Sequence, residues 1–223
     1  RSKLDGGLWP PRLLDRARAS GYDLTPRFIL MNSAKEQRET LRSRESSTQV
    51  GHRSPRGIAI LKVCVLGSGS SGNAIYVESP KVRLLIDAGL SGRELSRRLN
   101  GLGRRPEELR AILLSHEFTD HIQGAKALIK RYGIPLYLNE GTHQGAREVL
   151  NGLNEVHHFS PGQPFPLEDL WVEPFSVPHD ANDPVGFNLH LGTKKVSIAL
   201  DLGYITRLIQ ERMRGAELII LES

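Results

Sequence analysis

The chain has 223 residues, of which 39% are hydrophobic and 6% aromatic, a composition typical of a soluble globular protein with one main domain. No run reaches the roughly 20 apolar residues of a membrane helix, and the amino terminus carries no apolar secretory core. The single Cys64 excludes both a disulfide framework and a multi-cysteine zinc cluster. These features together favour a cytoplasmic protein without membrane contact. The net charge of +5 comes from residues 1–60, which hold 12 Lys and Arg against 6 Asp and Glu, so basicity is weak evidence for a nucleic-acid partner of the remainder.

Residues 1–57 show no sustained helical or strand period. The stretch from Ser33 to Arg56 is rich in Ser, Arg, Glu and Gln and has few apolar side chains to bury. Such a composition does not offset the chain entropy lost on folding, so we expect a disordered basic leader. The alternative is a basic arm that contacts nucleic acid, although acidic residues are interspersed among the basic ones.

From residue 58 onward the pattern is that of one mixed α/β domain over residues 58–223. Apolar runs bounded by turn residues predict strands at 58–66, 74–78, 82–86, 111–114, 134–138, 156–159, 170–177, 186–191, 196–200 and 218–221. Helices are predicted at 122–132, 140–150 and 205–214, together with one that follows Ser91 as its N-cap and carries Leu95 and Leu99 on one face. The last apolar strand is followed only by Glu222 and Ser223, so we expect the carboxyl-terminal part of the domain to be missing.

The strongest chemical signal is the segment Ser115-His-Glu-Phe-Thr-Asp-His121, directly after a short apolar strand. Two histidines and an aspartate in one loop offer the nitrogen and oxygen ligands that zinc, manganese and iron take. The same residues would also suit a helix amino terminus capped by Thr119 or Asp120. Taken alone, this segment leaves the two interpretations open.

Three further candidate ligands follow apolar strands. Asp87 comes after the strand at 82–86, His179 after the strand at 170–177, and Asp201 after the strand at 196–200. Strands that end in His or Asp bring distant ligands to one edge of a sheet, as metal-dependent hydrolases require. The repetition of this pattern favours a metal site over isolated turn residues.

These motifs resemble the metallo-β-lactamase superfamily, and within it the WalJ- or YycJ-type exonuclease branch. The resemblance rests on five segments in this order along residues 61–223: 65–73 (VLGSGSSGN), 85–89 (LIDAG), 115–121 (SHEFTDH), 175–181 (FSVPHDA) and 201–203 (DLG). It implies an α/β fold, the four-layer αβ/βα sandwich. It also implies a site for two divalent metal ions, zinc or manganese.

Residue by residue, the resemblance implies His116 and His179 as ligands of the first metal, Asp120 and His121 as ligands of the second, and Asp201 as the bridge between the two. The implied reaction is hydrolysis of a phosphodiester by a metal-activated hydroxide. The implied activity is that of a 5′–3′ exonuclease on DNA.

Two further roles follow from the same resemblance. Asp120 would also position the nucleophile, and Asp87 would orient the ligands without binding metal. No ligand position matches His143, His157, His158 or His190, which we interpret as ordinary surface or core residues.

The chain departs from the family pattern in two places. Phe118 stands where the family has a second loop histidine, and the chain ends before the last histidine ligand. Five ligands of seven remain, so this chain could hold a single metal. A fragment or sequence artefact, a decayed gene and a mononuclear variant would each produce this pattern. A lactone or thioester hydrolase of the same fold and a catalytically silent scaffold remain as alternative functions.

The glycine-rich segment 67–72 (GSGSSG) also fits the dinucleotide-binding fingerprint. That fingerprint requires a helix next, whereas residues 73–78 favour a strand and therefore a hairpin. A loop of small residues beside the metals could instead hold a substrate phosphate through its backbone N–H groups. Arg93, Arg97 and Arg98 are candidate phosphate contacts, or simply the solvated face of their helix.

Overall fold

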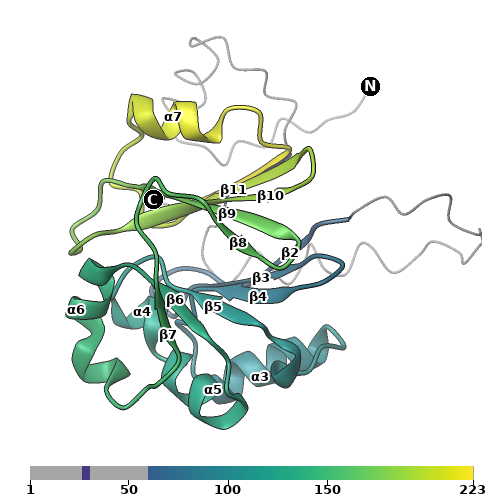
Figure 1. Cartoon of the computed structure of the whole chain (residues 1–223), viewed down its shortest axis with the longest axis vertical. Helices are drawn as coiled ribbons and strands as arrows, with labels where there is room; N and C mark the ends of the chain where they lie inside the picture. The colour runs from purple at the N-terminus through teal and green to yellow at the C-terminus, as the bar shows by residue number, and fades with distance from the viewer. Residues whose placement is uncertain (1–26, 31–59, 223) are drawn as a thin grey trace, which may run out of the picture.

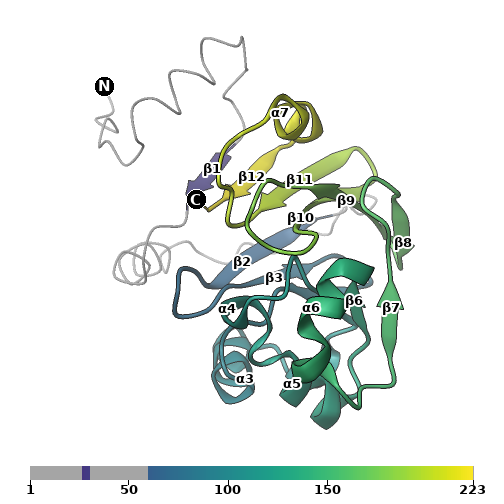
Figure 2. The same ribbon diagram turned by 90° about the vertical axis from the view of Figure 1, so that its left-hand side faces the viewer.

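The computed structural model describes residues 27–30 and 60–222. Two six-stranded sheets pack face to face, with α3 to α6 on the outer face of one sheet and α7 on the outer face of the other (Figures 1 and 2). The four-layer αβ/βα arrangement expected from the sequence is confirmed.

The first sheet contains the amino-terminal half of the domain in the order β2-β3-β4-β5-β6-β7. Its first three strands form antiparallel hairpins, and β4 to β7 run parallel to one another. The strands are β2 (Lys62–Gly67), β3 (Ala74–Glu78), β4 (Arg83–Ile86), β5 (Ala111–Leu113), β6 (Leu136–Leu138) and β7 (Val156–His158).

The second sheet has the order β1-β12-β11-β10-β9-β8. Strands β8 to β11 form an antiparallel meander, whereas β11 and β12 run parallel. The strands are β1 (Arg27–Leu30), β8 (Phe165–Leu167), β9 (Leu170–Ser176), β10 (Val185–Leu191), β11 (Lys194–Ala199) and β12 (Leu218–Leu221). β1 pairs in parallel with β12 and was not expected; the other residues of the expected leader, 1–57, lie outside the described part of the chain.

The helices are α3 (Gly92–Gly101), α4 (Thr119–Ile122), α5 (Ala125–Tyr132), α6 (Glu140–Leu150) and α7 (Arg207–Met213), with a 3-10 turn at Pro106–Glu108. The Ser91 side chain accepts a hydrogen bond from Glu94 N, which confirms the predicted cap of α3. The single helix expected over 122–132 is instead two helices. The chain breaks at Gly124, where a Cβ would lie 2.2 Å from the Leu90 carbonyl oxygen, so close backbone packing overrides helical continuity.

Alternating strand residues divide the apolar core into three layers. Between the sheets, Ile75 and Leu84 of one sheet pack with Phe187 and Leu189 of the other. The opposite faces contact the helices. Leu85 belongs to the layer under α3 and α5, and the layer under α7 contains Phe175, Ile209 and Ile219. This alternation fixes which strand ends meet at the edge of the sandwich.

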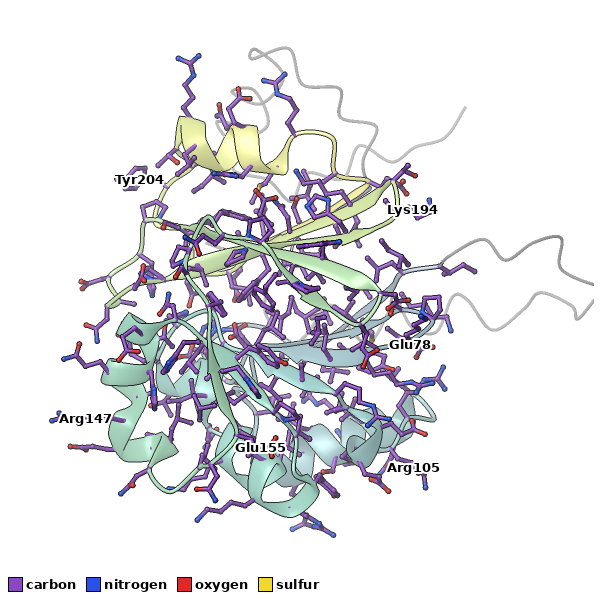
Figure 3. The ribbon with its side chains drawn as sticks, in the orientation of Figure 1. Glu78, Arg105, Arg147, Glu155, Lys194 and Tyr204 are labelled. Atoms are coloured by element: carbon purple, nitrogen blue, oxygen red, sulfur yellow. The ribbon has the colours of Figure 1, made fainter. Side chains whose placement is uncertain are left out.

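In Figure 3, Glu78 at the end of β3 and Lys194 at the start of β11 lie on the right, whereas Tyr204, which follows β11, lies on the left. β4 and β11 therefore run toward the left-hand edge, and the loops that follow them lie there. Within the described residues, no helix is long and apolar enough to cross a membrane.

Candidate metal centre

Asp87 lies immediately after β4 and is fully buried. Its Oδ1 accepts a hydrogen bond from Ser115 N at 2.8 Å, and its Oδ2 accepts one from Ser115 Oγ at 2.7 Å. The same Oδ2 lies 2.7 Å from His121 Nδ1. With Nδ1 donating to the carboxylate, the Nε2 atom of a neutral His121 carries the free lone pair. Asp87 thus contacts the His121 ring nitrogen opposite Nε2, where it could orient that ring; this role stays a prediction.

His116, His121 and Asp201 form a compact cluster in which one ligand atom of each lies within 4.8 Å of the others. Asp201 Oδ2 lies 2.8 Å from His121 Nε2 and 3.4 Å from His116 Nε2. His116 Nδ1 lies 2.9 Å from Ser115 Oγ, which leaves Nε2 directed at the cluster. Two imidazoles and a carboxylate at this spacing are a donor set suited to a divalent cation.

The two other predicted ligands lie beside this cluster. The His179 ring centroid is 4.9 Å from that of His116, and Asp120 Oδ2 is 3.8 Å from His121 Nε2. The Nε2 atoms of His116 and His179 are both buried without a hydrogen-bond partner among the described residues. Buried imidazole nitrogens without partners are costly, and a bound cation would satisfy both. His116, His121 and Asp201 therefore fit a divalent metal ion, and His179 and Asp120 lie beside them.

The Phe118 ring lies beside two of these histidines. Its ring centroid is 5.0 Å from that of His116 and 5.1 Å from that of His179, edge to face in both cases. The side chain is 39% exposed. An apolar ring therefore occupies the position at which the family pattern has a nitrogen ligand.

The segment 119–122 forms the short helix α4, whose N-cap is Phe118 without a side-chain hydrogen bond. Thr119 and Asp120 lie inside its first turn. Neither of them therefore caps the helix. The alternative interpretation of the segment 115–121, a helix amino terminus capped by Thr119 or Asp120, is thus wrong.

The electrostatics of the cluster favour a cation. Burial disfavours a charged His121, but the carboxylates of Asp87 and Asp201 outweigh it and raise the His121 pKa to about 10. Burial acts against a charged Asp201 as well, yet the neighbouring imidazoles of His116 and His121 hold its pKa below the usual range. Burial and neighbouring imidazoles lower the pKa of His179. In the absence of metal, the His121 proton supplies the positive charge that the carboxylates require.

Backbone geometry holds the ligands in place. Asp87 and Asp201 both have positive φ, at 59° and 52°, a conformation that is uncommon outside glycine and that clusters at functional sites. A Cβ at Gly89 would lie 1.6 Å from the Asp120 carbonyl oxygen, so this contact requires glycine. Asn73 N donates to the same carbonyl at 2.7 Å, which ties α4 to the glycine-rich loop.

The sequence analysis missed two polar residues of the site. Asn73 Nδ2 lies 2.9 Å from His121 Nε2. Glu222 is 8% exposed, and burial together with the nearby Asp201 raises its pKa to about 7. Glu222 directly follows β12, as Asp87 follows β4 and Asp201 nearly follows β11. The pattern of apolar strands followed by an acidic residue also holds for the last strand. Applied there, it would have identified Glu222.

The remaining predictions are resolved as follows. β3, not a helix, follows the glycine-rich loop, so the dinucleotide-binding alternative fails. Arg97 and Arg98 pair with Glu94, and Arg98 also donates to the Leu66 carbonyl. The other histidines have partners outside the cluster: His143 with His158, His157 with Tyr137, and His190 with Glu173.

A polar cavity of about 460 Å³ lies between α6 and the loop that follows His179. It is lined by Gln144, Gly145, Arg147, Glu148 and Asn182. Asn182 N donates to Glu117 Oε1 at 2.9 Å, and Glu117 directly follows His116. The cavity is therefore linked to the segment 115–121. Arg147 lies on the same side of the molecule as Tyr204 (Figure 3).

Residues 82–223 match the family model described as a beta-lactamase superfamily domain. The chain is 40% identical over 159 residues to a protein of Streptococcus pneumoniae named exodeoxyribonuclease WalJ, a match that covers 69% of this chain and 57% of that protein. It is 33% identical over 165 residues to the Bacillus anthracis exodeoxyribonuclease YycJ, covering 73% and 62%. The chain thus spans about three fifths of the length of these relatives.

Solved structures show the same fold. YhfI of Bacillus subtilis, a metallo-beta-lactamase fold protein, superposes with a TM-score of 0.61 at 19% identity, over 72% of this chain and 70% of that one. Zn²⁺-bound PqqB of Methylobacterium extorquens gives 0.59 at 19% identity, over 74% and 71%. At these identities the likeness concerns the fold alone.

Proposed function

The chain belongs to the metallo-β-lactamase superfamily, and from this premise we propose that it carries the metal centre of a hydrolase that cleaves phosphodiesters at DNA ends. The observation that carries the proposal is the cluster of His116, His121 and Asp201. The Nε2 atoms of His116, within the cluster, and of His179, beside it, are both buried without a hydrogen-bond partner among the described residues. The DNA substrate is supported by the two relatives named exodeoxyribonucleases. The 5′–3′ direction is a further part of the proposal.

In this proposal His116 and His179 would hold one cation, Asp120 and His121 would hold a second, and Asp201 would supply a further carboxylate ligand. Bound divalent cations supply Lewis acidity toward a phosphodiester and lower the pKa of the attacking water; zinc and manganese both suit these donors. Because Phe118 takes one donor position, this chain could retain a single cation.

The protein's own groups orient the reaction. Asp87 and Ser115 fix the His121 ring through the hydrogen bonds described above, so its Nε2 stays directed at the cluster. Asp120 has a part-exposed side chain beside His121. Its carboxylate accepts a hydrogen bond from the attacking water and positions that water against the phosphorus.

Phe118 favours a second candidate function. An apolar ring beside His116 and His179 weakens the donor set, which suits a protein that binds metal and DNA ends without cutting them. The cluster geometry alone is also compatible with lactone or thioester hydrolysis, but the named relatives favour DNA.

Elemental analysis of the purified chain, combined with release of nucleotides from end-labelled DNA, tests the proposal. We expect bound metal and EDTA-sensitive cleavage, both lost in His116→Ala and both kept in His143→Ala, whose ring lies outside the cluster. Metal without cleavage would favour the binding-only candidate. A wild-type chain without metal under metal-replete conditions would overturn both.

A further inference from the structure

The loop after Asp201 is fixed on several sides. Leu202 N donates to the Glu222 carbonyl at 2.9 Å, and Gly203 N donates to the Pro178 carbonyl at 2.9 Å. At its far end, Thr206 Oγ1 accepts from Ile209 N and caps α7. The backbone that carries Tyr204 is therefore tied to the residue preceding His179 and to a helix start.

Tyr204 is 67% exposed, the highest value among the exposed large hydrophobic side chains of the described residues. Leu202, two residues before it, is 4% exposed, whereas Leu208 in α7 is 49% exposed. Figure 3 shows Tyr204 at the left-hand edge, beside the start of α7. The ring is therefore open to solvent while the backbone on both sides of it is fixed by hydrogen bonds.

We propose that the Tyr204 ring is a stacking platform for the terminal nucleobase of a DNA strand whose phosphodiester lies at the metal centre. The inference deepens the proposed function and rests on it. Tyr204 lies three positions after Asp201, a chain length of at most about 11 Å. Successive bases of a strand are on the order of 3.4 Å apart, so this distance corresponds to at most about three base steps.

The chemistry of the loop suits such a ligand. Every nucleobase has an aromatic face, so stacking on tyrosine binds a strand end without selecting its sequence. Arg207, exposed three residues further on, supplies a cation for the adjoining phosphate. This subsite selects nucleotides over phosphodiesters, lactones or thioesters that lack a base.

The test measures DNA affinity by fluorescence anisotropy in EDTA, so that cleavage does not interfere. The probes are a single-stranded 12-mer and two versions with an abasic residue at the 5′ or the 3′ end. We expect the wild type to lose affinity on the order of tenfold for one abasic end. Tyr204→Leu binds intact and abasic strands with the same reduced affinity, whereas Tyr204→Phe behaves as the wild type.

The matched control is Trp171→Leu. Trp171 is also an exposed aromatic, at 56%, but lies at the opposite end of β9 from His179. The Trp171→Leu variant should keep the wild-type preference for DNA with an intact terminal base. Melting temperatures of all variants should match that of the wild type, because both rings are solvent-exposed.

The outcomes separate this inference from the proposed function. Equal affinity of the wild type for intact and abasic ends, or a Tyr204→Leu variant that still distinguishes them, overturns the stacking platform even where DNA is cleaved. If binding to DNA ends depends on Tyr204 but no DNA is cleaved, the stacking platform is supported and the proposed nuclease activity is rejected. A wild type that binds no DNA overturns the platform, whereas the nuclease is decided separately by the cleavage assay in the presence of metal.

Discussion

Asp87 Oδ2 and His121 Nδ1 lie 2.7 Å apart, and neither side chain is exposed to solvent. This contact sets the tautomer of His121 and holds its other nitrogen toward Asp201. Replacing a buried carboxylate that orients a ligand typically lowers metal affinity by about 10- to 100-fold. We therefore expect Asp87→Asn to bind Zn²⁺ that much more weakly in a competition assay with a chromogenic chelator.

The control for this prediction is Asp169→Asn, which removes a carboxylate that accepts from Ser79 Oγ far from the cluster. It should leave Zn²⁺ affinity unchanged. An Asp87→Asn variant that is folded and binds Zn²⁺ as tightly as the wild type would show that the contact only supports the fold.

The raised pKa of His121 predicts proton release on metal binding. At pH 7.5 a group with a pKa of about 10 is protonated, and it must lose that proton to bind a cation through Nε2. Calorimetric titrations in two buffers of different ionisation enthalpy should report about one proton released per metal at His121. Identical heats in both buffers would contradict a charged His121.

The same shift affects the stability of the metal-free protein. Because the folded-state pKa lies above the unfolded value of 6.5, charged His121 stabilises the fold fully below about pH 6.5. This contribution is lost as the pH rises toward 10. We expect the melting temperature in EDTA to fall over that interval, and to fall less in the Asp87→Asn variant.

Phe118→His should strengthen the metal site. The Phe118 ring lies about equally far from His116 and His179, so an imidazole in its place would present a nitrogen to the same cation. We expect at least tenfold tighter Zn²⁺ binding, measured by chelator competition. Phe118→Leu is the control, because it changes the ring without adding a donor; equal affinities of the two variants would argue that the histidine does not reach the metal.

Glu78, at the opposite edge of the sandwich, should make the stability of the protein depend on pH in the acid range. Its carboxylate accepts from Arg104, Tyr76 and Lys62, and the pKa is lowered to about 2, chiefly by Arg104. A lowered folded-state pKa gives stability that is complete above the unfolded value of 4.5 and is lost as the pH falls toward 2. The contribution should be roughly 2 kcal/mol, less than the whole shift would give because the partner cations are part-exposed.

Urea unfolding of the wild type and of Glu78→Gln at pH 7 and pH 3 tests this. The variant should be less stable at pH 7, and the difference should shrink at pH 3. A constant difference across that range would mean that the charge of Glu78 does not contribute.

The amino-acid sequence by itself determined the fold class and supplied candidate members of the site, whose roles stay predictions. Apolar runs and helical spacing predicted β3, α6 and β12 at their observed limits, and Ser91 predicted the start of α3, because such signals act over a few neighbouring residues. The strand-end pattern together with the family resemblance proposed His116, Asp120, His121, His179 and Asp201, and the structure places these residues near one another.

Only the tertiary structure decided how these residues act on one another. The burial of Glu222, the contact of Asn73 with His121 and the break between α4 and α5 each depend on segments far apart in the chain. The position of Phe118 beside two histidines and the exposure of Tyr204 are of the same kind. Local propensity carries no information about such contacts, because they arise only when two sheets close over a common core and set the distance between their loops.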